Sequence, residues 1–194
     1  MEAAVDRLHT LDYALGQLRQ VVGTLDDSVM DGPTNCAPWS VRRLASHALN
    51  NQLVWAGVVT GQQLVAPADA LDAVAIPGDL EPVAADVSGR VMAVWRTEGL
   101  LDATHETPFG ALPGSVVIDF AIIDAAAHAW DLSASLGQPV EFDPSEIPVL
   151  AEVVDVTCTD AARDHDLIKA ATTLPFDATD TERLMAAAGR TIPR

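Results

Sequence analysis

Apolar residues recur every three or four positions along most of this chain, which is the spacing of an amphipathic helix. Segments with this spacing cover 3–24, 41–59, 83–101, 115–136, 145–170 and 180–188. The segment at 115–136 differs from the others because it is apolar almost all the way round. We therefore expect an all-α fold in which the four long helices up to residue 136 form a bundle.

Turn-forming and capping residues separate these segments. Gly and Pro residues mark loops or connections at 26–38, 60–82 and 104–114. The residues that we expect to begin or end helices are Ser40, Ser115, Gly137 and Pro139. The length suits one domain over 1–194. We expect a core bundle at about 3–137 and an extension of one or two helices at about 140–194.

The apolar helix at 115–136 carries one narrow polar stripe. At about 100° per residue, Asp124, His128, Asp131 and Ser135 fall within an arc of about 60°. Asp124 and His128 are one helical turn apart, so both side chains can reach a single point. Ionisable groups inside a core are costly unless they are hydrogen-bonded, paired or bound to a cation. The pattern leaves two readings open: a buried Asp–His hydrogen bond, or a metal site.

A third metal ligand would favour the metal site, and His47 is the best candidate. It lies on the flank of the apolar face of the helix at 41–59, with Asn51 one turn further on. Asp131 could accept a hydrogen bond that orients an imidazole. It could equally make an ordinary hydrogen bond at a helix end or between helices.

Other titratable residues carry weaker signals. Cys36 could be a nucleophile in its proline-bounded loop, although packing against Trp39 explains it as well. The histidines that we expect to be solvated or structural are His9, His105 and His165. The sequence contains no Gly-rich phosphate loop and no GxSxG elbow.

Composition narrows the class of partner. The formal charge is −17, from 28 acidic and 11 basic residues, which disfavours nucleic acids and anionic membranes as partners. No apolar run is long enough for a transmembrane helix, and the N-terminus lacks the features of a signal peptide. We therefore expect a cytoplasmic protein whose two cysteines, Cys36 and Cys158, are reduced.

Three motifs in order resemble one protein family. TNCAPWSVRRLASHALNNQ, PFGALPG with DAAAHAWDLSASLGQ, and TDTERLMAAAGRTIP resemble signatures of the mycothiol-dependent maleylpyruvate isomerase N-terminal family. This family belongs to the DinB-like superfamily, and the last motif is similar to the close of its short actinobacterial branch. The resemblance covers nearly the whole chain.

The resemblance implies a DinB-like four-helix bundle that binds a divalent metal through His47, Asp124 and His128. Two imidazoles and a carboxylate suit catalytic Zn²⁺, and the same ligands can hold Ni²⁺, Fe²⁺ or Mn²⁺. The isomerase has Glu where this chain has Asp124, one methylene shorter, so a metal would lie closer to the helix. The isomerase also carries an additional C-terminal domain, whereas this chain has only about 55 residues after Gln138.

The resemblance also implies a reaction. Mycothiol would bind the metal as a thiolate and attack a small electrophile, giving a thiol transferase or an isomerase. Asn51 and Asp131 would orient ligands or substrate. Two other classes stay open: a metal-dependent hydrolase, and a non-catalytic, metal-stabilised sensor or interaction protein that could form a homodimer.

Overall fold

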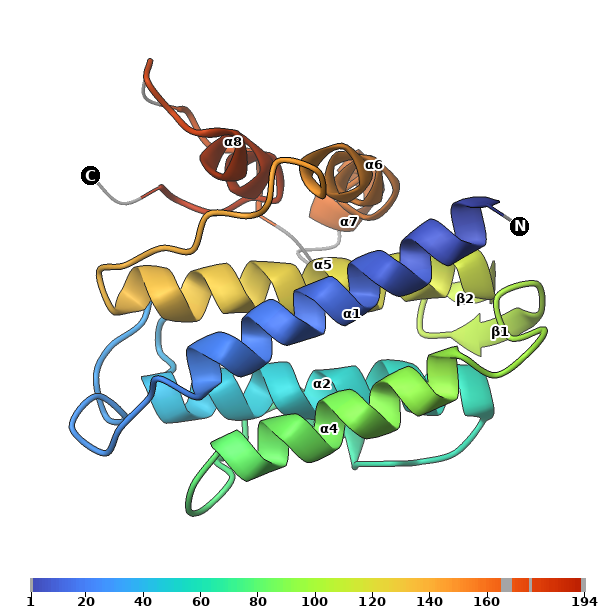
Figure 1. Cartoon of the computed structure of the whole chain (residues 1–194), viewed down its shortest axis with the longest axis horizontal. Helices are drawn as coiled ribbons and strands as arrows, with labels where there is room; N and C mark the ends of the chain where they lie inside the picture. Colours follow the sequence, from blue (N-terminus) through green and yellow to red (C-terminus); the bar gives the residue numbers. More distant parts are fainter. Residues whose placement is uncertain (1, 165–168, 175, 193–194) are drawn as a thin grey trace.

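The computed structural model describes residues 2–164, 169–174 and 176–192. Within these residues, the four longest helices are α1 (Glu2–Val22), α2 (Val41–Thr60), α4 (Glu81–Trp95) and α5 (Gly114–Ser135). Helices α1 and α2 each pack against both α4 and α5, so the four helices form a bundle (Figure 1). The all-α four-helix bundle expected from the sequence is confirmed.

The core of the bundle explains why α5 is apolar on nearly every side. Helices α1 and α2 cover two of its faces, and α6 (Ile147–Thr157) covers a third (Figure 1). Ile118, Ile122, Trp130 and Leu132 of α5 are each fully buried. Burying one such side chain contributes about 1.5–3 kcal/mol, which offsets the cost of placing polar groups on the same helix.

Two connections contain regular structure that the sequence pattern did not predict. The loop expected at 60–82 includes a short helix, α3 (Pro67–Leu71). The connection at 104–114 forms an antiparallel hairpin of β1 (Thr104–Thr107) and β2 (Gly110–Pro113). The Thr107 hydroxyl closes the turn by accepting from the Phe109 amide at 3.0 Å and donating to the Gly110 carbonyl at 2.7 Å.

Helix boundaries also differ from expectation in part. The Ser40 hydroxyl caps α2 by accepting from the Arg43 amide at 3.4 Å, as predicted. Ser115 does not cap α5, because the helix begins one residue earlier, after Pro113. Helix α4, which was expected at 83–101, ends at Trp95, and successive turns lead from there to the hairpin.

The C-terminal extension forms a layer on the bundle, over α1 and α5 (Figure 1). The single helix expected at 145–170 is instead α6 and α7 (Asp160–Asp164), which are separated at Cys158. The Cys158 backbone leaves the helical region there (ψ 46°), and the Thr159 hydroxyl accepts from the Ala162 amide to start the next turn. The last described helix, α8 (Asp180–Ala187), packs against α6 and begins with a capping box. Across the described residues, none of the helices is long and apolar enough to cross a membrane.

Candidate metal centre

The polar stripe of α5 faces α2, and the two helices bring three potential metal ligands together. One ligand atom each from His47, Asp124 and His128 lies within 4.8 Å of the others. The His47 and His128 rings meet edge to face, with their centroids 4.8 Å apart. His128 is buried, whereas Asp124 and His47 are partly accessible. The residues that sequence reasoning selected as ligands therefore converge.

The orientation of His47 is set by α3. Its Nδ1 lies 2.7 Å from the Ala70 carbonyl oxygen, and a carbonyl can only accept a hydrogen bond. Nδ1 therefore carries the proton and Nε2 keeps a free lone pair. Burial and the neighbouring His128 lower the pKa of His47, which favours this neutral form. The unpredicted helix α3 thus supplies the hydrogen bond that fixes the His47 ring and leaves its Nε2 available as a ligand atom.

Asp124 is held by two amides of α2. Asn51 donates from Nδ2 to Oδ1 at 2.8 Å, and Gln52 donates from Nε2 to Oδ2 at 2.9 Å. Burial opposes the charge on Asp124, but the hydrogen bonds and nearby histidines outweigh burial and lower its pKa. Asn51 thus contacts Asp124, and its role in orienting a ligand or substrate stays a prediction. Gln52 was not predicted, although a glutamine next to Asn51 on a helix packed into a core indicates a buried contact.

His128 lies between two carboxylates. Its Nδ1 is 3.1 Å from Asp131 Oδ2, and its Nε2 is 3.5 Å from Asp124 Oδ1. Burial works against the charged form of His128, but hydrogen bonds to both carboxylates and to the Cys36 thiol raise its pKa well above the ordinary value. The centre therefore stabilises positive charge, and a metal ion would have to displace the proton on Nε2.

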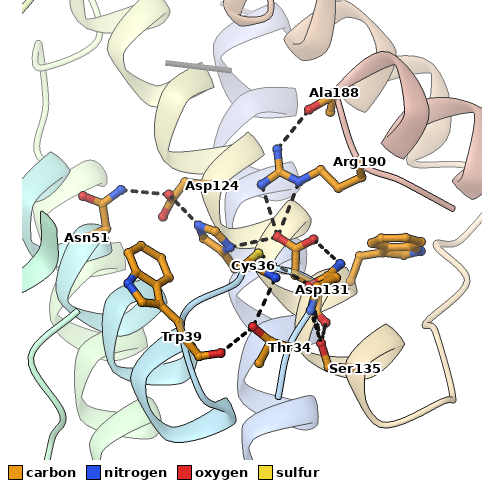
Figure 2. Close-up of polar contacts among 12 residues, drawn as sticks. Thr34, Cys36, Trp39, Asn51, Asp124, Asp131, Ser135, Ala188 and Arg190 are labelled. Carbon is orange, nitrogen blue, oxygen red and sulfur yellow. Dashed lines mark hydrogen bonds and ion pairs between the residues drawn. The ribbon is translucent and has the colours of Figure 1, made fainter. Parts of the chain in front are cut away.

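Asp131 joins three segments of the chain at the buried side of the centre (Figure 2). Its Oδ1 accepts from Asn35 Nδ2 at 3.0 Å. Its Oδ2 faces His128 and also accepts from two guanidinium nitrogens of Arg190, at 3.2 and 3.4 Å. Burial opposes the Asp131 charge, but Arg190 and His128 outweigh burial and lower the pKa of Asp131. Asp131 thus contacts an imidazole, which is one of the two interactions that the sequence left open, and its contacts with Asn35 and Arg190 were not predicted.

The remaining candidates lie in different surroundings. The Cys36 thiol is not only packed near Trp39, because it lies within 4.8 Å of ligand atoms of His128 and Asp131. His9 is exposed and pairs with Glu146, and the His105 ring donates to the Leu100 carbonyl, so neither faces the centre. His165 lies outside the described residues. Cys36 and Cys158 are both free thiols.

Comparison with known proteins agrees with this architecture. The family model described as the mycothiol maleylpyruvate isomerase N-terminal domain matches residues 11–133. The chain belongs to this family. The matched residues include all three candidate ligands together with Asn51 and Asp131, whereas Arg190 lies beyond them.

Individual proteins are similar to this chain over part of its length. An uncharacterized protein of Mycobacterium tuberculosis, found in two strains, is 33% identical over 119 residues, which are 59% of this chain and 59% of that protein. The match thus spans about three fifths of the length of these relatives. Crystal structures of mycothiol-dependent maleylpyruvate isomerase and of a histidine-to-alanine mutant each align with a TM-score of 0.62 at 16% identity. The alignments cover 78% of this chain and 69% of the isomerase, and they show a shared fold.

Proposed function

We propose that this member of the family binds one divalent metal ion through His47, Asp124 and His128 and promotes the reaction of a low-molecular-weight thiol with a small electrophile. The observation that carries the proposal is the convergence of the three ligand atoms within 4.8 Å. The name of the family points to mycothiol as the thiol. The reaction would be an S-transfer or, where the addition reverses after bond rotation, an isomerisation.

The donor set fits such an ion. His47 donates its Nδ1 proton to a backbone carbonyl and His128 directs Nδ1 at a carboxylate, so both rings can offer Nε2. Two imidazoles and one carboxylate, with further positions left open, suit catalytic Zn²⁺, and Ni²⁺, Fe²⁺ and Mn²⁺ accept the same ligands. When bound, the ion would supply Lewis acidity that lowers the pKa of a thiol and favours its thiolate.

The protein's own residues would prepare this chemistry in three ways. Asn51 and Gln52 hold the Asp124 carboxylate in place, and Ala70 holds the His47 ring. Asp131 would accept the Nδ1 proton of His128 and so keep its Nε2 directed at the centre. Because Arg190 balances the Asp131 charge, the carboxylate can stay ionised although it is buried.

The first test is the metal content of purified protein, measured by elemental analysis. We expect close to one divalent ion per chain, lost in His128→Ala and much reduced in Asp124→Asn. His105→Ala is the matched control, because its imidazole bonds to the Leu100 carbonyl away from the centre, and it should keep the metal. Unchanged metal in His128→Ala, or loss in His105→Ala, would show that the ligands are assigned wrongly.

The second test addresses the thiol. Mycothiol should bind zinc-loaded protein in calorimetry and should bind much more weakly after the zinc is removed by a chelator. Thiol binding that is equal with and without zinc would contradict the proposed role of the metal, even if the metal assignment holds.

A further inference from the structure

Three aromatic side chains stack beside the candidate metal centre, and we call them the aromatic cluster: Trp55, Phe109 and Phe120. The Trp55 and Phe120 rings are nearly parallel, at 17°, with centroids 5.3 Å apart. Phe109, in the hairpin turn, lies 5.3 Å from Phe120 and 6.4 Å from Trp55. These separations are those of favourable aromatic pairs.

The cluster continues the row of contacts that forms the centre. Helices α2 and α5 meet through His47 with His128, then through Asn51 with Asp124. The next pair along both helices is Trp55 with Phe120, because each lies four residues from a member of the previous pair. One helical turn is a rise of about 5.4 Å, so the aromatic rings begin one turn from Asp124.

The cluster is accessible although it is apolar. Phe109 is 44% exposed, and Trp55 and Phe120 are only partly buried. Other large side chains of these two helices, such as Leu49 and Ile122, are almost completely buried. Adjoining, partly exposed aromatic rings beside a polar centre are a common mark of a ligand site.

Charge indicates what kind of ligand fits. Among the described residues, the centre holds the carboxylates of Asp124 and Asp131 and one guanidinium, that of Arg190, which is already paired with Asp131. With both histidines neutral, the two carboxylates and the guanidinium together carry one negative charge. A divalent cation and a thiolate would bring the total to zero, which leaves no positive charge to attract an anionic substrate. The aromatic cluster adds no charge, and the chain as a whole carries −17.

We propose that the aromatic cluster binds the planar, apolar part of a neutral aromatic or conjugated electrophile and holds its reactive carbon toward the thiol. The chemical step rests on the proposed function, whereas binding to the cluster does not. With a halogenated aromatic substrate, the thiol sulfur forms a bond to the ring carbon. The carbon–halogen bond then breaks, the halide leaves with the bonding electrons, and the thiol proton passes to water.

Binding can be tested with a pair of unreactive probes that share one ring system and differ in charge. Calorimetry with naphthylmethanol and with naphthoate, on protein treated with a chelator so that no metal ion can bind the carboxylate, should show tighter binding of the neutral alcohol. Phe109→Ala should weaken naphthylmethanol binding about tenfold, the effect of losing about 1.4 kcal/mol. Phe176→Ala is the matched control, because that side chain is fully exposed outside the cluster, and it should bind like the parent. Equal binding by the two variants, or tighter binding of naphthoate, would overturn the proposal.

The same measurement separates this proposal from the metal proposal. Protein treated with a chelator, and the His128→Ala variant, should still bind naphthylmethanol even though they lack metal. Suppose that these metal-free proteins bind the probe but the zinc-loaded parent does not promote the reaction of the thiol with chlorodinitrobenzene. The aromatic cluster is then a binding site, and the proposed chemistry is wrong. Because Phe109 is in an exposed turn, its truncation should leave the fold intact, and circular dichroism will verify this.

Discussion

Replacing Arg190 with methionine should destabilise the protein, because it removes a positive charge that is paired with a buried carboxylate. The Asp131 side chain is only 1% exposed, and the guanidinium of Arg190 approaches its Oδ2 through two nitrogens, at 3.2 and 3.4 Å. Methionine keeps much of the length and apolar packing of arginine but offers no charge and no hydrogen-bond donor.

The expected size of the effect follows from what Asp131 retains. Removing one partner of a buried ion pair typically costs about 3–5 kcal/mol. Asp131 would keep its hydrogen bond from Asn35 and its contact with His128, which reduces the expected loss to about 2–3 kcal/mol. For a chain of this size, such a loss lowers the melting temperature by roughly 5–10 °C.

Thermal and urea denaturation, followed by circular dichroism, will measure this loss. Arg183→Met is the matched control, because that arginine is exposed on α8, and it should change the free energy of unfolding by less than about 0.5 kcal/mol. Adding Asp131→Asn to Arg190→Met removes the unpaired charge, so the double variant should be at least about 1 kcal/mol more stable than additivity predicts. The reasoning is refuted if both arginine variants lose equal stability, or if the two substitutions at the ion pair are additive.

Three further predictions concern the centre and the bundle. Asp124→Glu should retain stoichiometric zinc in elemental analysis, because glutamate keeps the carboxylate that the isomerase uses there; loss of zinc would mean that the position tolerates only the shorter side chain. Zinc should raise the melting temperature more at about pH 8 than at about pH 6, since His128, whose pKa is raised, must lose a proton to bind. In metal-free protein the pH dependence of stability has the opposite sign, because the stabilisation from protonated His128 is complete at low pH and is lost as pH rises through its raised pKa. An equal effect of zinc on the melting temperature at both pH values would argue against His128 as a ligand. Gly114→Ala should cost more than about 2 kcal/mol, because a Cβ there would lie 2.1 Å from the Leu100 carbonyl oxygen, whereas Gly89→Ala, in open space within α4, should be neutral or stabilising in the same denaturation assay.

Much of the bundle could be predicted because helices are encoded locally. The repeat of apolar residues located α1, α2 and α5 to within a few residues of both ends, whereas α4 was located at its beginning but ends earlier than expected, at Trp95. The hairpin and α3 could not be predicted in this way, because both are short and carry no clear period. They depend on turn hydrogen bonds, such as those of Thr107, and on packing against helices formed elsewhere in the chain.

The sequence by itself determined that Asp124, His128 and Asp131 share one face of a single helix, since helical geometry places residues three or four positions apart side by side. It also indicated His47 as a candidate third ligand, because of its place on the flank of a second helix and because of the family resemblance. Only the tertiary structure decided what surrounds them: the Ala70 carbonyl on His47, Gln52 on Asp124, and the guanidinium of Arg190 on Asp131. Those partners are separated along the chain by 23, 72 and 59 positions, and no local period relates residues so far apart. Their meeting depends on how the helices pack, and the packing is an outcome of the whole core.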